Sequence, residues 1–527
     1  MKGTFHKSIV DKTLLYIILA FYLLSICLIN FSAVPSFYDA DMYCDYRYAM
    51  EAWTHKSLFP DGWVFGNQLN AVSTPVLAAI LYGVTNSMNF SMALACVMMS
   101  VLLVLSFDWM IKAVIRSPES RLMAIVLLIT ISLYCGRAVH GNQGWTLLFT
   151  MCSYYAGYGI TAFLAFGCYI RGLLGTVNKQ TAVMVAVTCI LCFGTGIQSI
   201  RQTAIMVVPI LAVEFLRFIT MFRVWKTDRT PFWLAAGITV SNIMGLCYVR
   251  MREINQNQIF GPIELTSLPD VKQAIASCFA MIKDLLGADH PEAFFLLACF
   301  GILCLVALIF IFRNAITERK YGIAWLTLLI GFSVLVIVAI DVLTTMYIRP
   351  RYYFMLYPLI SFLVAYLHDS RTIKMKRSLL AFVTVFFCLA CVRNLPEVCV
   401  SAIRHNEEDS FAISDYLLEK GYTTVYAEWN RGHDVSIASD GRIDAGYWYV
   451  EERPFEKVTH LCSLDIYERD GSECVYLFVG EDDAQTGISA AESVGVPLEF
   501  VEYFSESDTY LYTAPVNLMQ IFDGKYL

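Results

Sequence analysis

Residues 14–41 read LLYIILAFYLLSICLINFSAVPSFYDAD, and the fold of the chain is decided here. An apolar run of about 20 residues is long enough to cross a bilayer as one helix. Two carboxylates, Asp39 and Asp41, follow where such a helix would leave the lipid. Charged groups near a membrane are costly to dehydrate unless they face water, a partner or a substrate. The stretch therefore predicts a membrane helix that ends at a chemically active surface.

The composition extends this prediction to many membrane helices. The chain has 527 residues, of which 57% are apolar and 16% are charged, whereas soluble domains carry roughly 25% charged residues. A further apolar piece, 71–84, is short and contains Pro75. Eleven stretches are candidates for spanning helices: 14–33, 90–111, 121–136, 146–170, 181–198, 203–219, 231–249, 292–312, 322–345, 352–367 and 378–394.

The distribution of basic residues predicts the orientation, because Lys and Arg gather on the cytoplasmic side of membrane proteins. All the basic clusters fall on one side if residues 71–84 do not cross the membrane, so we expect an interfacial or half-inserted helix there. The N-terminus is then cytoplasmic. Residues 1–394 form the membrane domain, with outer loops at 34–90 and 250–291. The clusters are 2–12, 112–121, 171–179, 217–229, 313–320 and 371–377.

Residues 395–527 differ sharply in charge from the rest of the chain. They hold 26 acidic and 8 basic residues, a net charge of −18, whereas residues 1–394 hold 19 acidic and 30 basic residues, a net charge of +11. This contrast predicts a separate extracytoplasmic α/β domain. A helix is expected at 408–420 and another at 487–494, with strands at 423–427, 475–479 and 498–504. Nothing in the sequence suggests nucleic acid binding.

The cysteines of the chain show no metal-binding spacing. Most of the 17 lie in apolar runs, where Cys behaves as a small hydrophobic residue. Two cysteines of the tail, Cys462 and Cys474, either form a disulfide or remain as core thiols.

Asp39 and Asp41 support more than one chemical interpretation. In an extended segment, residues two apart face the same side, so both carboxylates could bind one divalent metal, Mg or Mn. In a helix, Asp41 and Asp45 would share a face instead. A carboxylate in a dry cleft can also act as a general base. The structural alternative is that one of the two acids caps a helix N-terminus.

Four arginines, Arg137, Arg201, Arg349 and Arg351, fall on the outer side, against the general bias for cations to stay inside. Guanidinium groups at helix ends can hold a lipid phosphate through charge-assisted, often bidentate hydrogen bonds. Alternatively, each side chain snorkels or pairs with a nearby acid. Tyr352, which follows Arg351, suits an interfacial aromatic belt.

Three short motifs together resemble the GT-C superfamily, multipass glycosyltransferases that use polyprenyl-phosphate-linked sugars. They are the acids after the first helix, the segment QLNAVSTP at 68–75, and Arg351-Tyr352 with Pro358 before a late helix. The tail segment 426–430, followed by residues 439–443, is similar to the outer domain of bacterial members. One departure is that Ser73-Thr74 precede Pro75, where many members have a histidine or lysine. The resemblance implies a polytopic GT-C-like bundle of about 11 helices with juxtamembrane helices in the first loop, in a bacterial cell membrane.

The resemblance also implies an activity, namely a hexosyl- or pentosyltransferase. It would move a sugar, with inversion, from a polyprenyl-phosphate donor to a glycan or glycolipid acceptor on the outer face. Asp39 would be the base, with Asp41 as its assistant or as a metal ligand. The residues expected to bind the substrates are Arg351 and Arg349 with Tyr352 and Arg201 for the lipid phosphate, and Tyr38 and Trp63 for stacking on sugar rings.

Two other functions share parts of this pattern. A flippase or transporter of a lipid-linked glycan predicts charged residues at mid-membrane depth, but Glu214 and Asp341 lie near the ends of their helices and Asn242 is a mild case. A polymerase or ligase of surface polysaccharide would share the outer active face without needing an acidic tail. The crowding of polar residues on the outer side favours the transferase.

Overall fold

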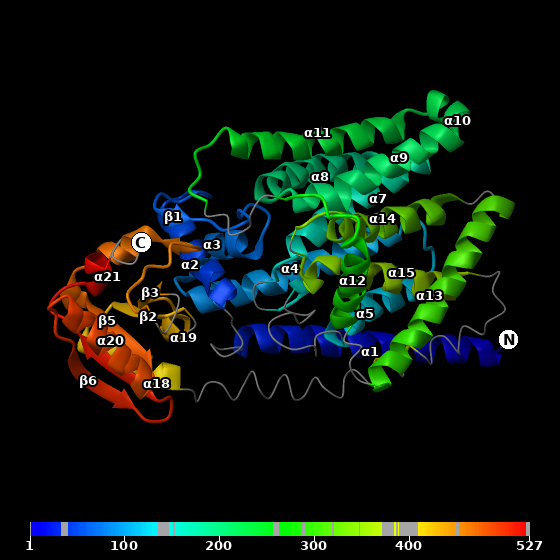
Figure 1. Ribbon diagram of the computed structural model, residues 1–527. Coiled ribbons are helices and arrows are strands. Elements are labelled where there is room, and N and C mark those ends of the chain that lie inside the picture. Colours follow the sequence, from blue (N-terminus) through cyan, green and yellow to red (C-terminus); the bar gives the residue numbers. More distant parts are fainter. Residues whose placement is uncertain are drawn as a thin grey trace.

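A computed structural model describes most of the chain as a helical bundle joined to a sheet-containing body (Figure 1). The described residues are 2–32, 40–134, 147–150, 153–256, 263–286, 291–318, 321–346, 348–370, 384–385, 388, 409–429, 431–448 and 453–522. Within this part of the chain, seven helices are long and apolar enough to cross a membrane. They are α1 (Lys2–Ser32), α4 (Met88–Ile111), α8 (Lys179–Gln198), the π-helix η3 (Thr203–Val207) continued by α9 (Val208–Thr220), α11 (Thr230–Arg250), α13 (Pro291–Glu318) and α14 (Tyr321–Leu343). The chain is therefore a multi-pass membrane protein.

Three further helices complete the bundle over predicted spans. α5 (Pro118–Tyr134) packs against α15 (Leu356–Asp369), and α7 (Ala156–Leu173) is buried on nearly every face among its neighbours. A 3-10 helix, η4 (Pro350–Tyr353), leads into α15, so that helix begins four residues later than predicted. The predicted span at 378–394 lies almost entirely outside the described residues. The remaining helices of this part are α10 (Phe222–Thr227) and α12 (Val271–Leu285).

The segment between α1 and α4 contains α2 (Ala40–Thr54), β1 (Trp63–Val64) and α3 (Thr74–Thr85). Pro75 lies in the first turn of α3, where its missing N–H breaks no helical hydrogen bond. With 12 residues, α3 is about 18 Å long at 1.5 Å per residue, well short of a hydrocarbon core of about 30 Å. Its length agrees with the prediction that residues 71–84 do not cross the membrane.

The tail contains a five-stranded mixed sheet with the strand order β3-β2-β5-β7-β6. β2 (Thr424–Glu428) pairs in parallel with both β3 (Asp444–Trp448) and β5 (Cys474–Val479), and an antiparallel hairpin of β6 (Glu499–Phe504) and β7 (Thr509–Thr513) completes the sheet. The helical elements of the tail are α18 (Asp409–Lys420), α19 (Arg431–Ala438), η6 (Leu464–Glu468), η7 (Gly471–Glu473), α20 (Glu481–Ser493) and α21 (Leu518–Ile521).

This sheet agrees with the α/β prediction for the tail. The predicted helix at 408–420 and the three predicted strands are present, and the helix predicted at 487–494 begins earlier, at Glu481. The sequence prediction missed β3 and β7, which are short and rich in aromatic residues. Cys462 and Cys474 are both buried free thiols, so the disulfide alternative is wrong for this structure.

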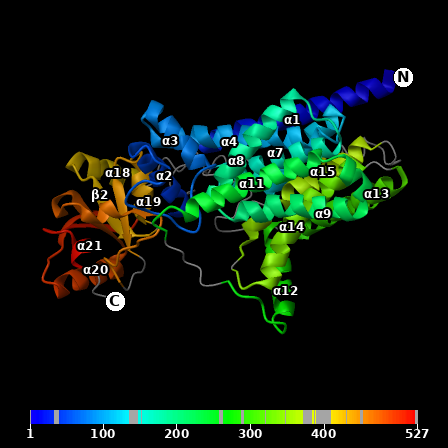
Figure 2. The same cartoon turned by 90° about the horizontal axis from the view of Figure 1, so that it is seen from above.

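The tail packs directly on the first loop (Figure 2). β1 pairs in antiparallel fashion with β4 (Cys462–Ser463), so that Trp63 lies opposite Ser463. One apolar cluster contains residues of both parts, including Ala49 of α2, Ala78 of α3 and Val425 of β2. Burial of a shared apolar cluster is the main force that holds two such parts together. The first loop is therefore the platform on which the sheet rests.

Candidate active site

The acid-bearing segment begins α2. Since the helix starts at Ala40, Asp41 and Asp45 lie one turn apart on the same face, as in the helical interpretation above. Asp39 and Tyr38 lie outside the described residues. Tyr48 lies on the same face of α2. Its burial is the main cause that raises the pKa of its hydroxyl, and the nearby Asp45 carboxylate raises that pKa further. Within the described residues, no three His, Cys, Asp or Glu side chains are grouped so that they could hold a metal ion.

A second polar group surrounds Arg201, which lies between α8 and η3. The guanidinium carbon of Arg201 is 4.3 Å from the ring centre of Tyr352, 5.4 Å from that of Tyr155 and 5.8 Å from that of Tyr158. Its Nη1 donates to the Tyr155 hydroxyl at 3.2 Å and to Oε1 of Gln68 at 3.3 Å. We call these five residues the arginine–tyrosine cluster.

Arg351 directly precedes Tyr352 in η4. The ring centre of Tyr352 lies 6.4 Å from that of Tyr155 and 4.3 Å from the guanidinium carbon of Arg201. Arg351 is therefore next in the chain to a member of the cluster. Arg349 is the residue before η4, and Arg137 lies outside the described residues. Two predicted phosphate-binding arginines, 150 positions apart in sequence, thus converge with Tyr352 on one place.

The partners of Arg201 distinguish it from a structural arginine. Across the described residues, it forms no ion pair with a carboxylate, and its hydrogen bonds go to neutral oxygens. The alternative in which Arg201 simply pairs with an acid is therefore wrong for this part of the chain. A guanidinium held among aromatic rings and neutral oxygens keeps its positive charge available for an anion.

Residues 68–72 connect the cluster to α2. Gln68 accepts hydrogen bonds from both Arg201 and the Tyr158 hydroxyl. The backbone of the same segment bonds to Gln198 at the end of α8, and the Tyr48 hydroxyl lies 3.4 Å from the Asn70 carbonyl oxygen. The segment also touches α7, where a Cβ on Gly157 would lie 1.8 Å from the Val72 carbonyl oxygen. This close approach requires glycine.

Trp63 does not have the position predicted for a sugar-stacking residue. Its indole is only 2% exposed and makes edge contacts with Tyr48 and Phe65. Burial on this scale leaves no free face for a sugar ring, and the side chain instead packs the core beneath β1. Aromatic side chains bury a large apolar area, so this position stabilises the platform.

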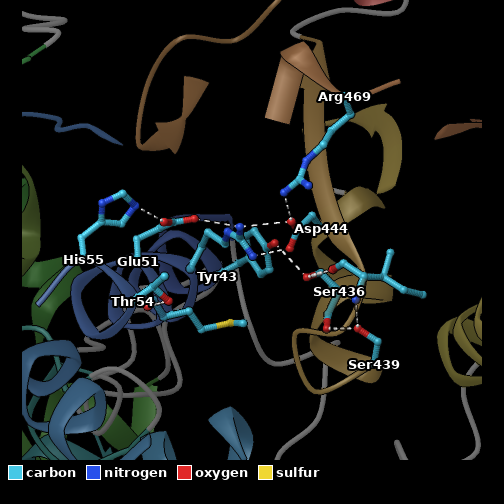
Figure 3. A network of polar contacts seen from close by, with 11 residues as sticks. Tyr43, Glu51, Thr54, His55, Ser436, Ser439, Asp444 and Arg469 are labelled. Atoms are coloured by element: carbon cyan, nitrogen blue, oxygen red, sulfur yellow. Dashed lines mark hydrogen bonds and ion pairs between the residues drawn. The ribbon is translucent and has the colours of Figure 1, made fainter. Parts of the chain in front are cut away.

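Other polar residues of the first loop bind the tail. The Tyr43 hydroxyl donates to Oγ of Ser436 at 2.8 Å (Figure 3). The ring of Tyr43 is tilted by 41° against that of His433, with 4.3 Å between the ring centres. Arg47 forms ion pairs with Glu51 of its own helix and with Asp444 of β3. These residues fix α2 against the sheet.

Sequence reasoning missed three members of the arginine–tyrosine cluster. Gln68 lies within the motif at 68–75, but its side chain carried no prediction. Tyr155 and Tyr158 stand in the segment SYYAGYG at 153–159. Tyrosines at the entrance of an apolar helix are a signal for the membrane interface, and that signal could have indicated them.

Comparison with known proteins supports the fold. No protein-family model matches the sequence, and no curated protein is similar to it. Among solved structures, apo ArnT from Cupriavidus metallidurans superposes with a TM-score of 0.55 at 9% identity, covering 96% of this chain and 98% of ArnT. ArnT bound to undecaprenyl phosphate gives a TM-score of 0.49 at 10% identity, with 95% and 98% covered. The archaeal oligosaccharyltransferase AglB from Archaeoglobus fulgidus gives 0.43 at 10% identity, with 81% and 64% covered.

The likeness to apo ArnT extends over nearly the full length of both chains, bundle and tail together. At 9% identity it shows a common fold. The chain therefore shares its fold with ArnT.

Proposed function

We propose that this protein is a membrane glycosyltransferase that moves a sugar from a polyprenyl-phosphate donor to a glycan or glycolipid acceptor. The observation that carries the proposal is the arginine–tyrosine cluster, which residues 68–72 join to the acid-bearing helix α2. One end of this arrangement suits an anionic phosphate and the other supplies carboxylates. ArnT, which has the same fold, has been solved bound to undecaprenyl phosphate.

The proposed reaction divides between these two ends. A carboxylate, Asp39 with Asp41 as its assistant, takes the proton of the acceptor hydroxyl. The acceptor oxygen then attacks the anomeric carbon from the face opposite the lipid phosphate. The bond between that carbon and the phosphate oxygen breaks, the phosphate leaves with the electron pair, and the sugar configuration inverts.

The arginine–tyrosine cluster would stabilise the negative charge that develops on the leaving phosphate. Arg201 and Arg351 stabilise it by charge-assisted hydrogen bonds, with Arg349 as a further candidate. The Tyr155 hydroxyl already contacts Arg201 and can donate to a phosphate oxygen. Positively charged groups that are positioned before the reaction cost no reorganisation when the leaving group forms, and this is the usual source of large catalytic effects.

The same proposal assigns the topology. About eleven spans within residues 1–394 would place the N-terminus in the cytoplasm, and the domain at 395–527 would lie on the outer face of a bacterial membrane. The acid-bearing helix α2 and the arginine–tyrosine cluster would then both face the outer side. The donor sugar, which hangs from a lipid, would reach the site from the bilayer.

The buried charges of the bundle favour a transferase over a flippase. Glu214 accepts hydrogen bonds from Arg217, Tyr169 and Trp225, so this buried carboxylate is fully engaged. The amide of Asn242 is engaged on both sides by Thr203 and by the Cys192 carbonyl oxygen. Polar groups that satisfy one another serve helix packing, whereas a transport pathway needs groups that are open to a passing substrate.

The test is a transfer assay on the purified protein with a panel of polyprenyl-phosphate sugars. Asp39→Asn should abolish donor cleavage, and Arg201→Gln should lower it by about 100-fold or more, the usual effect of losing one preorganised donor. Arg252→Gln is the matched control, because Arg252 also stacks on a tyrosine, Tyr248, but lies outside the cluster. Full activity in both Asp39→Asn and Asp41→Asn, or equal activity in the two arginine variants, would overturn the mechanism.

A further inference from the structure

A cavity of about 220 Å³ lies between α2 and the tail, apart from the arginine–tyrosine cluster. Its lining contains guanidinium groups, carboxylates and hydroxyl groups from both sides. Met50 and Ile466 provide a small apolar surface within it. The polar lining consists of Arg47, Glu51 and Thr54 from α2, and Ser463, Asp465 and Arg469 from the tail.

The α2 side of the cavity is a fixed wall. Arg47 bonds to Glu51 at 2.7 Å and to Asp444 of β3, and His55 lies 3.4 Å from the other oxygen of Glu51. Each charge of this wall therefore has a partner of opposite sign. A network with every member engaged holds its side chains in one arrangement, so the shape of this wall is set before any ligand arrives.

The tail side of the cavity has unused hydrogen-bonding capacity. Arg469 bonds to Asp444 through Nη2 at 3.1 Å (Figure 3). Its Nε is buried and has no partner among the residues that the structure describes. Among the described residues, the side chains of Ser463 and of the exposed Asp465 also make no hydrogen bond or ion pair. Buried donors without partners are rare in proteins because they are costly. Nε of Arg469 is such a buried donor. The hydroxyl of Ser463 and the exposed carboxylate of Asp465 line the same cavity, so a ligand with both donors and acceptors can bond to all three groups.

The charge and the size of the cavity narrow the chemistry of that ligand. Two guanidinium groups and two carboxylates balance, so neither an anion nor a cation is favoured by the lining as a whole. The volume is below the roughly 300–1,000 Å³ of pockets for drug-sized molecules. A single sugar ring meets these conditions, because each hydroxyl both donates and accepts and the ring carries a small apolar face.

We propose that this cavity binds one sugar ring of the acceptor glycan. The proposal rests on the transferase function proposed above and names the class of its acceptor. Residues 47–54 lie roughly 9 to 20 Å from Asp41 along α2, at 1.5 Å per residue. The ring in the cavity is therefore not the one that reacts but a more distant part of the same acceptor. Binding of such remote parts is what positions a substrate for reaction.

The binding test uses the full-length protein in nanodiscs and saturation-transfer NMR with methyl glycosides of glucose, galactose, mannose and N-acetylglucosamine. We expect at least one glycoside to bind. Asp465→Asn should weaken it at least about tenfold, since a hydrogen bond to a charged group is lost. Asp482→Asn, an exposed acid on α20 outside the cavity, should leave binding unchanged. Thr54→Phe, which fills the cavity from an exposed position, should abolish it.

Any of three results would overturn the proposal. One is that no glycoside binds to the wild type. Another is that Asp465→Asn and Thr54→Phe bind as the Asp482→Asn control does. The third is that acetate or glycine binds and no glycoside does, because the cavity would then prefer charged ligands to a neutral sugar ring.

Donor cleavage without acceptor is measured in parallel to separate this proposal from the function. Cleavage without glycoside binding refutes only the acceptor site. Glycoside binding without cleavage of any donor leaves a sugar site but refutes the transferase, and with it the role of the ring as acceptor.

Discussion

Replacing Arg47 by methionine should loosen the contact between α2 and the tail. The guanidinium of Arg47 is 16% exposed and joins Glu51 to Asp444, which is equally buried. Methionine keeps a similar length and removes the charge, so the apolar part of the contact is retained. The variant therefore reports on the ion pairs alone.

The expected loss in free energy depends on the partners that the Asp444 and Glu51 carboxylates retain in the variant. Breaking a buried ion pair by removing one partner costs about 3–5 kcal/mol when the other charge is left alone. Here Asp444 retains Arg469 at 3.1 Å and Glu51 retains His55 at 3.4 Å. We therefore expect a smaller loss of about 2 kcal/mol in the free energy of local opening, a factor of about 30 in the opening equilibrium.

Hydrogen exchange of β3 and α19 measures this equilibrium, because exchange in a docked element reports its local opening. Arg47→Met should raise exchange there about 30-fold. Arg442→Met is the control, since among the described residues Arg442 bonds only to a tail carbonyl, that of Ser439. The double variant with Asp444→Asn should lose less than the sum of the two single variants. Additive losses, or unchanged exchange in Arg47→Met, would refute the assigned role.

Three further outcomes follow from single residues. Burial holds the pKa of His433 well below its ordinary 6.5, so the unfolded chain takes up the proton first as the pH falls. Unfolding experiments should therefore show the free energy of unfolding falling below about pH 6.5, by up to about 1.4 kcal/mol per pH unit. The variant His433→Phe should remove this slope. Gly157→Ala should destabilise the protein by about 1–3 kcal/mol through its clash with the backbone of residues 68–72, seen as a lower melting temperature, whereas Gly331→Ala, with nothing within 4 Å, should not. Burial raises the pKa of Cys462 to about 12, so maleimide should label it only after denaturation, as read by mass spectrometry; rapid labelling of the folded protein would contradict this.

Much of the architecture follows from local composition. A bilayer selects helices by the length of each apolar run and by the charges at its ends, and both are properties of a short segment. Residues 14–33 therefore predicted a spanning helix, and the short run at 71–84 predicted a helix that stays on one side. The acidic tail was recognisable for the same reason, since its charge balance reverses that of residues 1–394.

The candidate site depends on the tertiary structure, because its parts are far apart in sequence. Arg201 and Tyr352 were each predicted, but that they share one cluster with Tyr155 and Gln68 follows only from how α7, α8 and η4 pack.

The structure likewise decided what the first loop does. Sequence reasoning assigned its aromatic residues to sugars, whereas Trp63 is buried and Tyr43 and Arg47 hold the tail. Hydropathy says that a side chain will be buried or exposed; the partner it meets depends on long-range packing, which no local pattern encodes.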